Sequence, residues 1–486
     1  MTIGEGETFA PSRYNFAFAD GAAEDVRIAL YNSGSGALIM LSGPHAEELA
    51  SQLLNASTQL DAECFEPALL EELRAGAFLI APDCDEVAVI RARFQRAREE
   101  TPIVITLTTT MDCNLGCYYC YEERSGARLD SKDIAPIIEL IGKRLAESRS
   151  RAVHVDWYGG EPLLNLSFIE AASLKIQRFC ADRGARYVAS IISNGTVWPD
   201  DVEDFIARHN IRQVQISFDG LQHHHDKRRR YRKAYKRNEE PQPSSFERTV
   251  ALVNRLVTCV RVDLRFNTDH GNSGDFLPFI EFARARGWFS APHPAVFQPA
   301  RLAAYSETSA FMRGSQLSLA EFDALRAQAR HQLAGEAKIE ESETPDGFPY
   351  PKTSVCAALA NNSAVVGADK LLYRCGLQVG EKGRAVSTLD QNASSPVGED
   401  GKWWSSFDPT RLPTCSVCSF LPICWGGCPK KHLERDELAI REQGRYWRTN
   451  LPRLIAQRAA FDGDVSYAEI PQSLQFRVSE AKACVD

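Results

Sequence analysis

The sequence has no long hydrophobic run and no leader of the secretory type. No stretch of 18 apolar residues occurs in its 486 residues, whereas a membrane-spanning helix needs about 20. The first residues, MTIGEGETFAPSRYNFAFADG, lack the basic segment and apolar segment of a secretory signal. We therefore expect a cytoplasmic protein that does not interact with a membrane.

The chain also lacks the excess of basic residues that polyanion-binding proteins need. Its formal net charge is -8 and its isoelectric point is about 5.8, which argues against a nucleic-acid partner. Small molecules or peptides are the default partners of such a chain. Its length allows two to four domains with large cores.

Disulfides are not expected in a reducing compartment, so the 14 cysteines need another explanation. Four of them stand alone in segments of helical or strand character, and we expect these to be core residues because free cysteine is often buried. These four are Cys64, Cys84, Cys180 and Cys259. The remaining cysteines concentrate in two regions, which indicates metal or redox chemistry.

The first region is the stretch TPIVITLTTTMDCNLGCYYCYEE at 101–123. Its residues 103–109 alternate as a buried strand does, and Cys113, Cys117 and Cys120 follow at once. Three thiolates do not complete a tetrahedral zinc site, and the loop contains no histidine. They can hold three irons of a 4Fe-4S cube and leave one iron open to a small chelating molecule. The alternative is a set of incidental buried cysteines.

The C-x3-C-x2-C spacing, with the aromatic Tyr119 before the last cysteine, resembles the cluster loop of the radical SAM enzymes. The resemblance implies that Cys113, Cys117 and Cys120 hold a catalytic [4Fe-4S] cluster. It also implies that S-adenosylmethionine (SAM) chelates the open iron, and that one-electron reduction releases a 5'-deoxyadenosyl radical that abstracts hydrogen from a substrate.

Strand and helix signals alternate from Ile103 to about Gly335, which predicts an α/β fold with a parallel sheet. Together with the resemblance, this pattern indicates a partial (β/α)6 TIM-like barrel, whose chemistry gathers at the C-terminal ends of its strands. The expected strands are 103–109, 152–157, 187–193, 212–218, 260–267 and 293–298. The expected helices are 131–147, 166–182, 200–209, 245–257, 274–286 and 318–334, the last with Ser318 and Glu321 at capping-box spacing.

Short polar motifs end several of these strands and resemble the family's SAM-binding elements. Two glycines in YGGEP would let a ligand approach the backbone closely, although such a string alone is an ordinary turn. The resemblance implies that SAM is bound through the GGEP, SNG and S-x-D-G elements and a strand-five asparagine. The positions that match are Tyr119, Gly159, Gly160, Glu161, Ser193, Asn194, Ser217, Asp219 and Asn267.

The segment HHHDKRRR at 223–230 follows the S-x-D-G element. A triple histidine suggests a metal site, but adjacent residues point in different directions, so we expect a solvated polar loop. In related enzymes an arginine after S-x-D-G pairs with the SAM carboxylate. Arg228, Arg229 and Arg230 are equal candidates for that role.

The first domain, predicted at 1–100, has α+β character. Apolar runs at 26–30 and 37–41 flank the turn YNSGSG and predict a hairpin, with helices after it. The exposed edge of such a sheet can accept an extended peptide as an added strand. The arrangement is similar to the winged-helix PqqD-like domains that bind leader peptides, and a purely structural cap is the alternative.

The last domain, predicted at 336–486, begins with a linker at 336–352 and ends in a helical tail. Its cysteines resemble a SPASM auxiliary-cluster domain, with zinc as the alternative. The resemblance implies that Cys356, Cys375 and Cys428 hold auxiliary cluster I and that Cys415, Cys418 and Cys424 hold three corners of cluster II. Two departures are Lys370 in place of the family's glycine and a missing last cysteine. The fourth ligand of cluster II is therefore Cys484, His432 or none.

Together these features predict a radical SAM/SPASM maturase of a ribosomally synthesised peptide. It would use SAM, the loop cluster, one or two auxiliary [4Fe-4S] clusters and an electron donor such as flavodoxin or ferredoxin, and would bind the precursor's leader through residues 1–100. The modification would be a crosslink, an oxidation or an epimerisation. The alternatives are an anaerobic sulfatase-maturase-like formylglycine-forming enzyme, which should work without residues 1–100, and a non-catalytic iron–sulfur scaffold or electron carrier.

Overall fold

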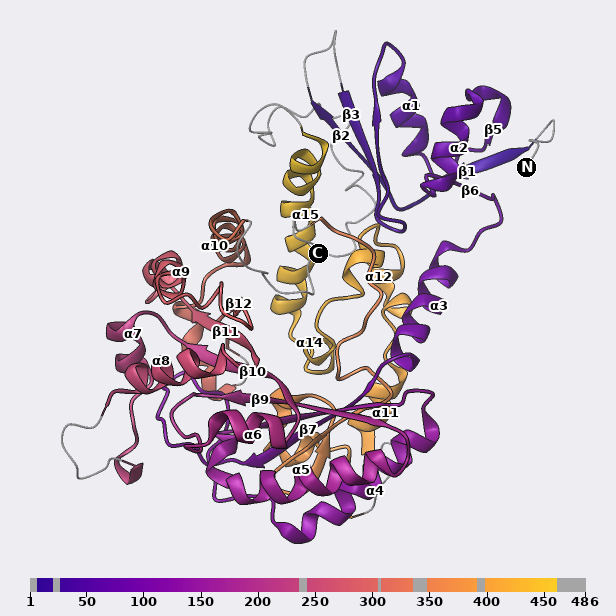
Figure 1. Ribbon diagram of the computed structural model, residues 1–486. Helices are drawn as coiled ribbons and strands as arrows, with labels where there is room; N and C mark the ends of the chain where they lie inside the picture. Colours follow the sequence, from indigo (N-terminus) through magenta and orange to yellow (C-terminus); the bar gives the residue numbers. More distant parts are fainter. Residues whose placement is uncertain are drawn as a thin grey trace. The chain divides into compact units, whose positions relative to one another are not determined.

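The computed structural model describes residues 7–20, 27–235, 243–304, 307–334, 348–390 and 398–460. The chain forms two compact units (Figure 1). The barrel unit contains Arg98–Ser342 and Cys356–Ser406, and the other, which we call the N/C unit, contains Met1–Ala97, Glu343–Val355 and Phe407–Asp486.

The barrel unit is built on six neighbouring parallel strands in the order β12-β11-β10-β9-β8-β7. The predicted strands are confirmed, although the last one begins three residues later than expected. The bounds are β7 (Ile103–Thr110), β8 (Ala152–Gly159), β9 (Arg186–Ser193), β10 (Ile211–Phe218), β11 (Arg261–Thr268) and β12 (Val296–Arg301).

The predicted helices are also confirmed, and α4, α5, α6 and α8 pack against the strands of this sheet. Capping boxes begin α8 at Ser244 and α10 at Ser318. In each, the serine Oγ accepts from the backbone N–H of a glutamate three residues later, and the serine N–H donates to that glutamate's carboxylate. The bounds of the predicted helices are α4 (Ile134–Glu147), α5 (Leu166–Ala181), α6 (Val202–Arg208), α8 (Ser245–Leu256), α9 (Phe276–Ala285) and α10 (Leu319–Gln332). A further helix that was not predicted is α7 (Gln222–Arg228).

The inner face of the sheet is polar. Along β8, Val153, Val155 and Trp157 are fully buried, whereas the residues between them are half-buried. On the face that carries these half-buried residues, Asp156 accepts hydrogen bonds from Ser190 Oγ at 2.5 Å and from Thr106 Oγ1 at 3.3 Å. The interior of the barrel is therefore lined by hydrogen-bonding groups at this level and is not a dry apolar core.

Beyond β7 the sheet continues with β13 (Ser363–Val366), β14 (Leu371–Tyr373) and β15 (Ser387–Thr388). β13 runs parallel to β7 and antiparallel to β14, which confirms the strand character expected between Cys356 and Cys375. Lys370 takes a positive φ of 67° in the turn before β14, which explains why glycine suits this position. Its ammonium lies 3.2 Å from Asp133 Oδ1.

Arg374, directly after β14, is held by backbone oxygens. Its Nε and Nη1 donate to the carbonyls of Ala358 and Ser363 at 2.9 and 2.8 Å. Burial and the nearby guanidiniums of Arg144 and Arg98 lower the pKa of Arg374 to about 10. A group of positive charges therefore lies beside the hairpin of β13 and β14.

The N/C unit contains the predicted hairpin, with a strand that the sequence did not predict on its other side. The sheet order is β2-β3-β4, and both pairs are antiparallel. A second small sheet has the order β5-β1-β6. The bounds are β1 (Thr8–Pro11), β2 (Asn15–Asp20), β3 (Arg27–Asn32), β4 (Leu38–Leu41), α1 (Ala46–Leu53), β5 (Leu60–Asp61), α2 (Pro67–Ala75), β6 (Leu79–Ile80) and α3 (Glu86–Glu99).

Both faces of the β2-β3-β4 sheet pack against other parts of the unit, although Met40 of the edge strand β4 is exposed. One face carries Ile28 and Leu30 and packs against residues of α1 and α2. The other face carries Phe16 and Tyr31 and packs against residues of the chain's C-terminal part, namely Phe420, Ile423, Leu451 and Ile455. The short helices there are α12 (Pro413–Ser416), α13 (Leu421–Cys424) and α14 (Pro429–Leu433), and the long one is α15 (Glu437–Ala459).

This packing differs from the three-domain division predicted from the sequence. Residues 336–486 do not form one unit, since Cys356–Ser406 belong to the barrel unit and the part after Phe407 packs with the N-terminal strands. The barrel unit also contains α11 (Gly398–Ser406). None of the helices in the described ranges has the length and hydrophobicity needed to cross a membrane.

The four solitary cysteines were not all predicted correctly. Cys180 is fully buried, as expected, and Cys259 is partly buried, but Cys64 and Cys84 are exposed. The expectation is wrong for these two because they lie in short turns after β5 and β6, where neither has a packed face.

Candidate functional site

The cluster loop follows the C-terminal end of β7, and residues after α7 hold it in place. Arg232 Nη1 donates to the carbonyl oxygen of Cys113 at 2.7 Å and to Asp112 Oδ1 at 2.5 Å. Gly116 N–H donates to the carbonyl of Arg230 at 2.7 Å. The loop is thus fixed by a segment more than 100 residues away in the sequence.

The three loop cysteines are partly buried and lie close enough to influence one another electrostatically. Burial is the main cause that raises the pKa of Cys113 to about 12 and the pKa of Cys120 to about 11. The neighbouring thiols of the loop add to both shifts. Among the described residues no three His, Cys, Asp or Glu side chains converge as one metal ion would require. The ligands of an iron–sulfur cube bind separate irons, so a cube does not require such a convergence, and iron binding would deprotonate these thiols.

The GGEP turn packs directly on the cluster loop. A Cβ on Gly159 would lie 2.3 Å from the Thr110 carbonyl oxygen, and one on Gly160 would lie 2.4 Å from that of Asp112. Gly160 N–H and Glu161 N–H donate to the same two carbonyls, each at 3.0 Å. The structure therefore gives both glycines a packing role against the cluster loop.

Glu161 joins the GGEP turn to the SNG element at the end of β9. Its fully buried carboxylate accepts from Ser193 Oγ at 2.9 Å and from Asn194 N–H at 2.7 Å. Burial outweighs these hydrogen bonds and raises the pKa of Glu161 to about 7. Asn194 Nδ2 in turn lies 3.7 Å from Cys113 Sγ and donates to Asn114 Oδ1 at 2.8 Å. Three of the predicted motifs are thus connected in space.

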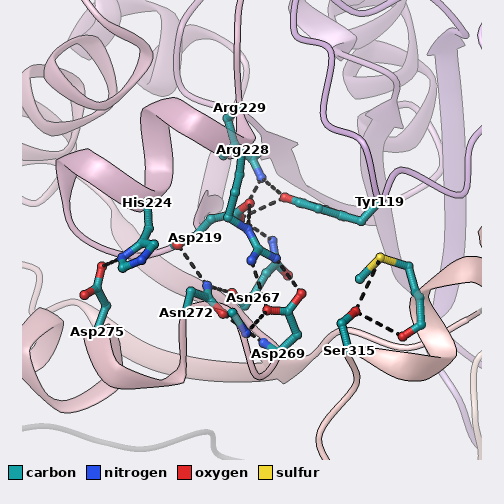
Figure 2. Close-up of polar contacts among 12 residues, drawn as sticks. Tyr119, Asp219, His224, Arg228, Arg229, Asn267, Asp269, Asn272, Asp275 and Ser315 are labelled. Carbon is teal, nitrogen blue, oxygen red and sulfur yellow. Dashed lines mark hydrogen bonds and ion pairs between the residues drawn. The ribbon is translucent and has the colours of Figure 1, made fainter.

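Asp219 is the centre of a buried polar network at the end of β10 (Figure 2). Its Oδ1 accepts from Tyr119 Oη at 2.8 Å and from Asn267 Nδ2 at 3.2 Å. Two guanidiniums also contact it, those of Arg229 at 3.2 Å and Arg228 at 3.3 Å. Burial raises the pKa of Asp219, but the two arginines and the hydrogen bonds outweigh this and hold it below its usual value.

The network distinguishes among the three arginines that the sequence left as equal candidates for pairing with the SAM carboxylate. Arg228 and Arg229 are buried and paired with Asp219, whereas Arg230 is exposed. Arg228 also makes a two-pronged contact with Asp269, both distances being 3.0 Å (Figure 2).

Two members of the network, Asp269 and Asn272, were missed by the sequence interpretation. Asn272 donates to the carbonyls of Asp219 and Asn267, each at 2.8 Å. Their position just after β11 is the signal that could have found them. Ser217, which was expected in the site, is partly buried at the end of β10 and makes none of this network's hydrogen bonds among the described residues.

The triple histidine is not the solvated loop that we expected. His223–His225 belong to α7, and His225 is fully buried against the rings of Phe218 and Phe246. His224 Nδ1 lies 2.7 Å from Asp275 Oδ2. The prediction is wrong because His225 packs between Phe218 of β10 and Phe246 of α8, and sequence spacing does not reveal this tertiary packing.

A second polar group adjoins the cluster loop and was also missed. The hydroxyls of Tyr121 and Tyr158 contact each other, and Tyr158 also hydrogen-bonds with Glu122. Burial raises the pKa of Glu122 to about 7. Because β8 ends beside the loop, this group lies on the side where the barrel's chemistry is expected.

The cysteines proposed for auxiliary cluster I are divided between the units. Cys356 and Cys375 belong to the barrel unit, and Cys428 belongs to the N/C unit. Cys356 is exposed, while the other two are partly buried.

The cysteines proposed for cluster II all lie in the N/C unit. Cys418 and Cys424 are partly buried against the Phe16 core cluster. A Cβ on Gly426 would lie 3.7 Å from both Cys415 Sγ and His432 Nε2, so these two side chains face the same turn. His432 Nε2 is 2.7 Å from the Gly426 carbonyl oxygen, and a nitrogen that donates there is not available to bind iron. Cys484 lies outside the described residues.

Comparison with known proteins agrees with this geometry. Residues 107–243 match the family described as the Radical SAM superfamily. The chain is 24% identical over 383 residues to a serine-type anaerobic sulfatase-maturating enzyme of Klebsiella aerogenes, covering 74% of this chain and 90% of the relative. It is 32% identical over 150 residues to an enzyme of the same name from Bacteroides thetaiotaomicron, covering 30% of this chain and 34% of that one.

A solved structure, native anSMEcpe with bound AdoMet and Cp18Cys peptide, shares the fold. It is 16% identical, covers 74% of this chain and all of its own, and has a TM-score of 0.55. The matched family segment begins in β7 and includes the three cysteines, the GGEP turn, the SNG element and Asp219. The chain is therefore a radical SAM enzyme, related to the anaerobic sulfatase-maturating enzymes.

Proposed function

We propose that this enzyme modifies a ribosomally synthesised precursor peptide by hydrogen abstraction. The observation that carries the proposal is the set of three thiols at the end of β7, connected through Glu161, Asn194 and Asp219 to the motifs at successive strand ends. A [4Fe-4S] cluster held by Cys113, Cys117 and Cys120, with SAM, would supply a 5'-deoxyadenosyl radical that takes hydrogen from an unactivated carbon.

The residues at the strand ends would bind and orient SAM. Gly159 and Gly160 hold the GGEP turn against the cluster loop, so its carbonyls have a fixed direction. Glu161 is buried with a raised pKa, and a cationic amino group near the turn would stabilise its ionised form. Because Asp219 is occupied by protein donors, its role is to position Tyr119, Arg229 and Asn267.

A peptide substrate suits the polar interior. Hydrogen-bonding side chains such as Asp156 and Ser190 face the inside of the sheet, and such groups can orient the polar backbone of a peptide. The structural neighbour anSMEcpe was solved with a peptide bound. An external reductant such as flavodoxin or ferredoxin would reduce the cluster.

The other cysteine groups would hold auxiliary clusters that accept the electron or bind substrate. Cluster I would use Cys356, Cys375 and Cys428, and cluster II would use Cys415, Cys418 and Cys424. Cys415, Cys418 and Cys424 lie in one short segment that ends in a tight turn with positive φ at Trp425–Gly427, and this supports iron–sulfur ligation over simple packing for cluster II.

The leader of the precursor would bind at the β4 edge of the N-terminal sheet. β4 is an edge strand and carries the exposed side chain of Met40, whereas the residues of the other edge strand, β2, are mostly buried. A lysine at an edge discourages strand addition, so Met40→Lys should weaken precursor binding about tenfold, or ~1.4 kcal/mol. The matched control is Val89→Lys, also at an exposed apolar position of the N/C unit.

Binding is measured by fluorescence anisotropy with a labelled precursor peptide. Equal affinities for the Met40 and Val89 variants would remove the edge from the proposal. Deletion of residues 1–100 is not a clean test, because it would expose the core that Phe16 and Tyr31 form with Phe420 and Leu451.

The decisive experiment is anaerobic incubation of the reduced, cluster-reconstituted enzyme with SAM and a small precursor peptide encoded beside it. We expect 5'-deoxyadenosine and a changed peptide. Loss of two hydrogens would indicate a crosslink or oxidation, and deuterium uptake from heavy water without other mass change would indicate epimerisation. The absence of 5'-deoxyadenosine would refute the enzymatic proposal.

A second candidate is formylglycine formation, which the names of the curated relatives favour. It is tested by offering the same preparation a sulfatase-derived peptide with a serine or cysteine at the target position. Formylglycine carries an aldehyde, so a hydrazide probe labels it. Labelling of that peptide, with no reaction of the neighbouring precursor, would establish the second candidate in place of the first.

A further inference from the structure

A cavity of about 220 Å³ lies in the barrel unit, beside the hairpin of β13 and β14. Three arginines line it, Arg98 from the end of α3, Arg144 from α4 and Arg374 from the end of β14. None of the described residues that line it is acidic. The cavity is therefore partly open to solvent and carries an excess of positive charge.

Two donors at this cavity have no partner within the described part of the chain. Trp404 is only 1% exposed, and its indole Nε1–H makes no hydrogen bond there. Arg144 Nε is buried and similarly unpaired, although Arg144 Nη1 lies 3.3 Å from Glu147 Oε2. A buried donor without an acceptor destabilises the fold, so an acceptor bound in the cavity would remove that cost.

The donors approach from different elements, which bears on the shape of the ligand. Arg144 comes from α4 and Trp404 from α11, while the guanidinium of Arg374, which backbone carbonyls hold, adds positive charge. A carboxylate has two oxygens in one plane and is satisfied by a single guanidinium fork, whereas a phosphoryl group offers three oxygens in different directions. The volume exceeds the roughly 150 Å³ of an engineered cavity that holds benzene, so a phosphate or a small phosphate ester fits.

We propose that this cavity binds a phosphoryl group, either as inorganic phosphate or on a small ester. The site opens to solvent at Asn361 and Ser405, whose side chains are exposed. It lies beside the start of β13, which pairs with the N-terminal half of β7, and so away from the strand ends that carry the cluster loop. The bound anion would stabilise the hairpin that joins Cys356 to Cys375, and it takes no part in the radical chemistry.

The test is isothermal titration calorimetry on the full-length, cluster-loaded enzyme under anaerobic conditions. The probes are inorganic phosphate and methyl phosphate, with acetate at matched ionic strength as comparison. We expect saturable 1:1 binding of phosphate, weakened about tenfold or more in Arg144→Gln and in Trp404→Phe, because each removes one donor to a charged acceptor. Trp404→Phe keeps an aromatic ring and so preserves most of the packing.

The matched control is Arg183→Gln, which removes the same charge from an exposed position of the barrel unit. Phosphate affinity should be unchanged in this control. Tighter binding of methyl phosphate would identify an ester as the ligand class, and tighter binding of phosphate would identify the free anion. Absence of saturable phosphate binding, equal affinity for acetate, or equal weakening in the control would overturn the proposal.

Discussion

Asp219→Asn provides the most direct test of the network in Figure 2. The substitution keeps the shape of the side chain and removes its charge. Arg228 retains its two contacts of 3.0 Å with Asp269, whereas Arg229 loses the one carboxylate to which it is paired among the described residues. Breaking a buried ion pair from one side costs about 3–5 kcal/mol, because the remaining charge stays buried without compensation.

The expected loss can be measured by anaerobic thermal unfolding of the cluster-loaded enzyme. At about 2–4 °C per kcal/mol, the apparent melting temperature should fall by roughly 6–20 °C. Asp204→Asn is the matched control, because Asp204 is exposed on α6 and should change stability by less than about 0.5 kcal/mol. The assay also measures 5'-deoxyadenosine, which should fall as Tyr119 and Asn267 lose their acceptor.

A double substitution distinguishes charge burial from general damage. If the uncompensated guanidinium is the cause, Arg229→Met added to Asp219→Asn should recover part of the loss, with a coupling of about 0.5–3 kcal/mol. Additive losses in the double variant would refute the reasoning. So would a melting temperature of Asp219→Asn that equals that of the control.

Three further predictions concern other parts of the two units. Burial and the nearby Arg229 lower the pKa of His225 to about 3, so the unfolded state binds more protons than the folded state below about pH 6.5. Between pH 7.5 and 5.5 the wild type should therefore lose ~1.4 kcal/mol of unfolding free energy, or about 3–6 °C in melting temperature, and His225→Phe should not show this loss. Equal pH dependence in both would contradict this assignment. Gly160→Ala should lower 5'-deoxyadenosine formation about 100-fold, because the new Cβ would lie 2.4 Å from the carbonyl oxygen of Asp112 in the cluster loop. Gly126→Ala, in the same loop region, has open space around its Cβ and should retain activity; similar rates for the two variants would show that the GGEP turn can shift freely. Cys415→Ala should lower the iron content per chain while His432→Asn should not, since His432 Nε2 faces a carbonyl oxygen; an equal loss of iron would make His432 a ligand.

The sequence was sufficient to predict the parallel strands of the barrel and most of its helices, but not α7, which was expected to be a polar loop. The alternation of apolar residues in β8 and the capping serines of α8 and α10 are local signals, and each corresponds to an observed element. The two-residue strands β5, β6 and β15 were not predicted because they are too short to show a pattern. Such short strands form only because they pair with strands distant in the sequence, or with a longer neighbouring strand, in the folded chain.

The sequence predicted the residues of the site that belong to known motifs, but not the contacts among them. Glu161 and Asp219 were found from strand-end motifs, and so were partners such as Ser193 and Tyr119. Their pairing was not predicted, because hydrogen bonds such as Tyr119 to Asp219 join residues 100 positions apart. The burial of His225 depends in the same way on Phe246. Composition and spacing identify which side chains are chemically capable, and only the fold determines which of them are already paired.

The burial of both faces of the N-terminal sheet has a consequence for synthesis of the chain. The Phe16 face of that sheet is covered by residues after Phe407, and Ala97 is separated from Phe407 by 310 positions. At about 5–20 residues per second, a ribosome takes ~15–60 s to cover that distance. During this interval the nascent sheet presents an uncovered aromatic surface, so yield in a heterologous host should depend on chaperones that shield it or on slower growth at low temperature.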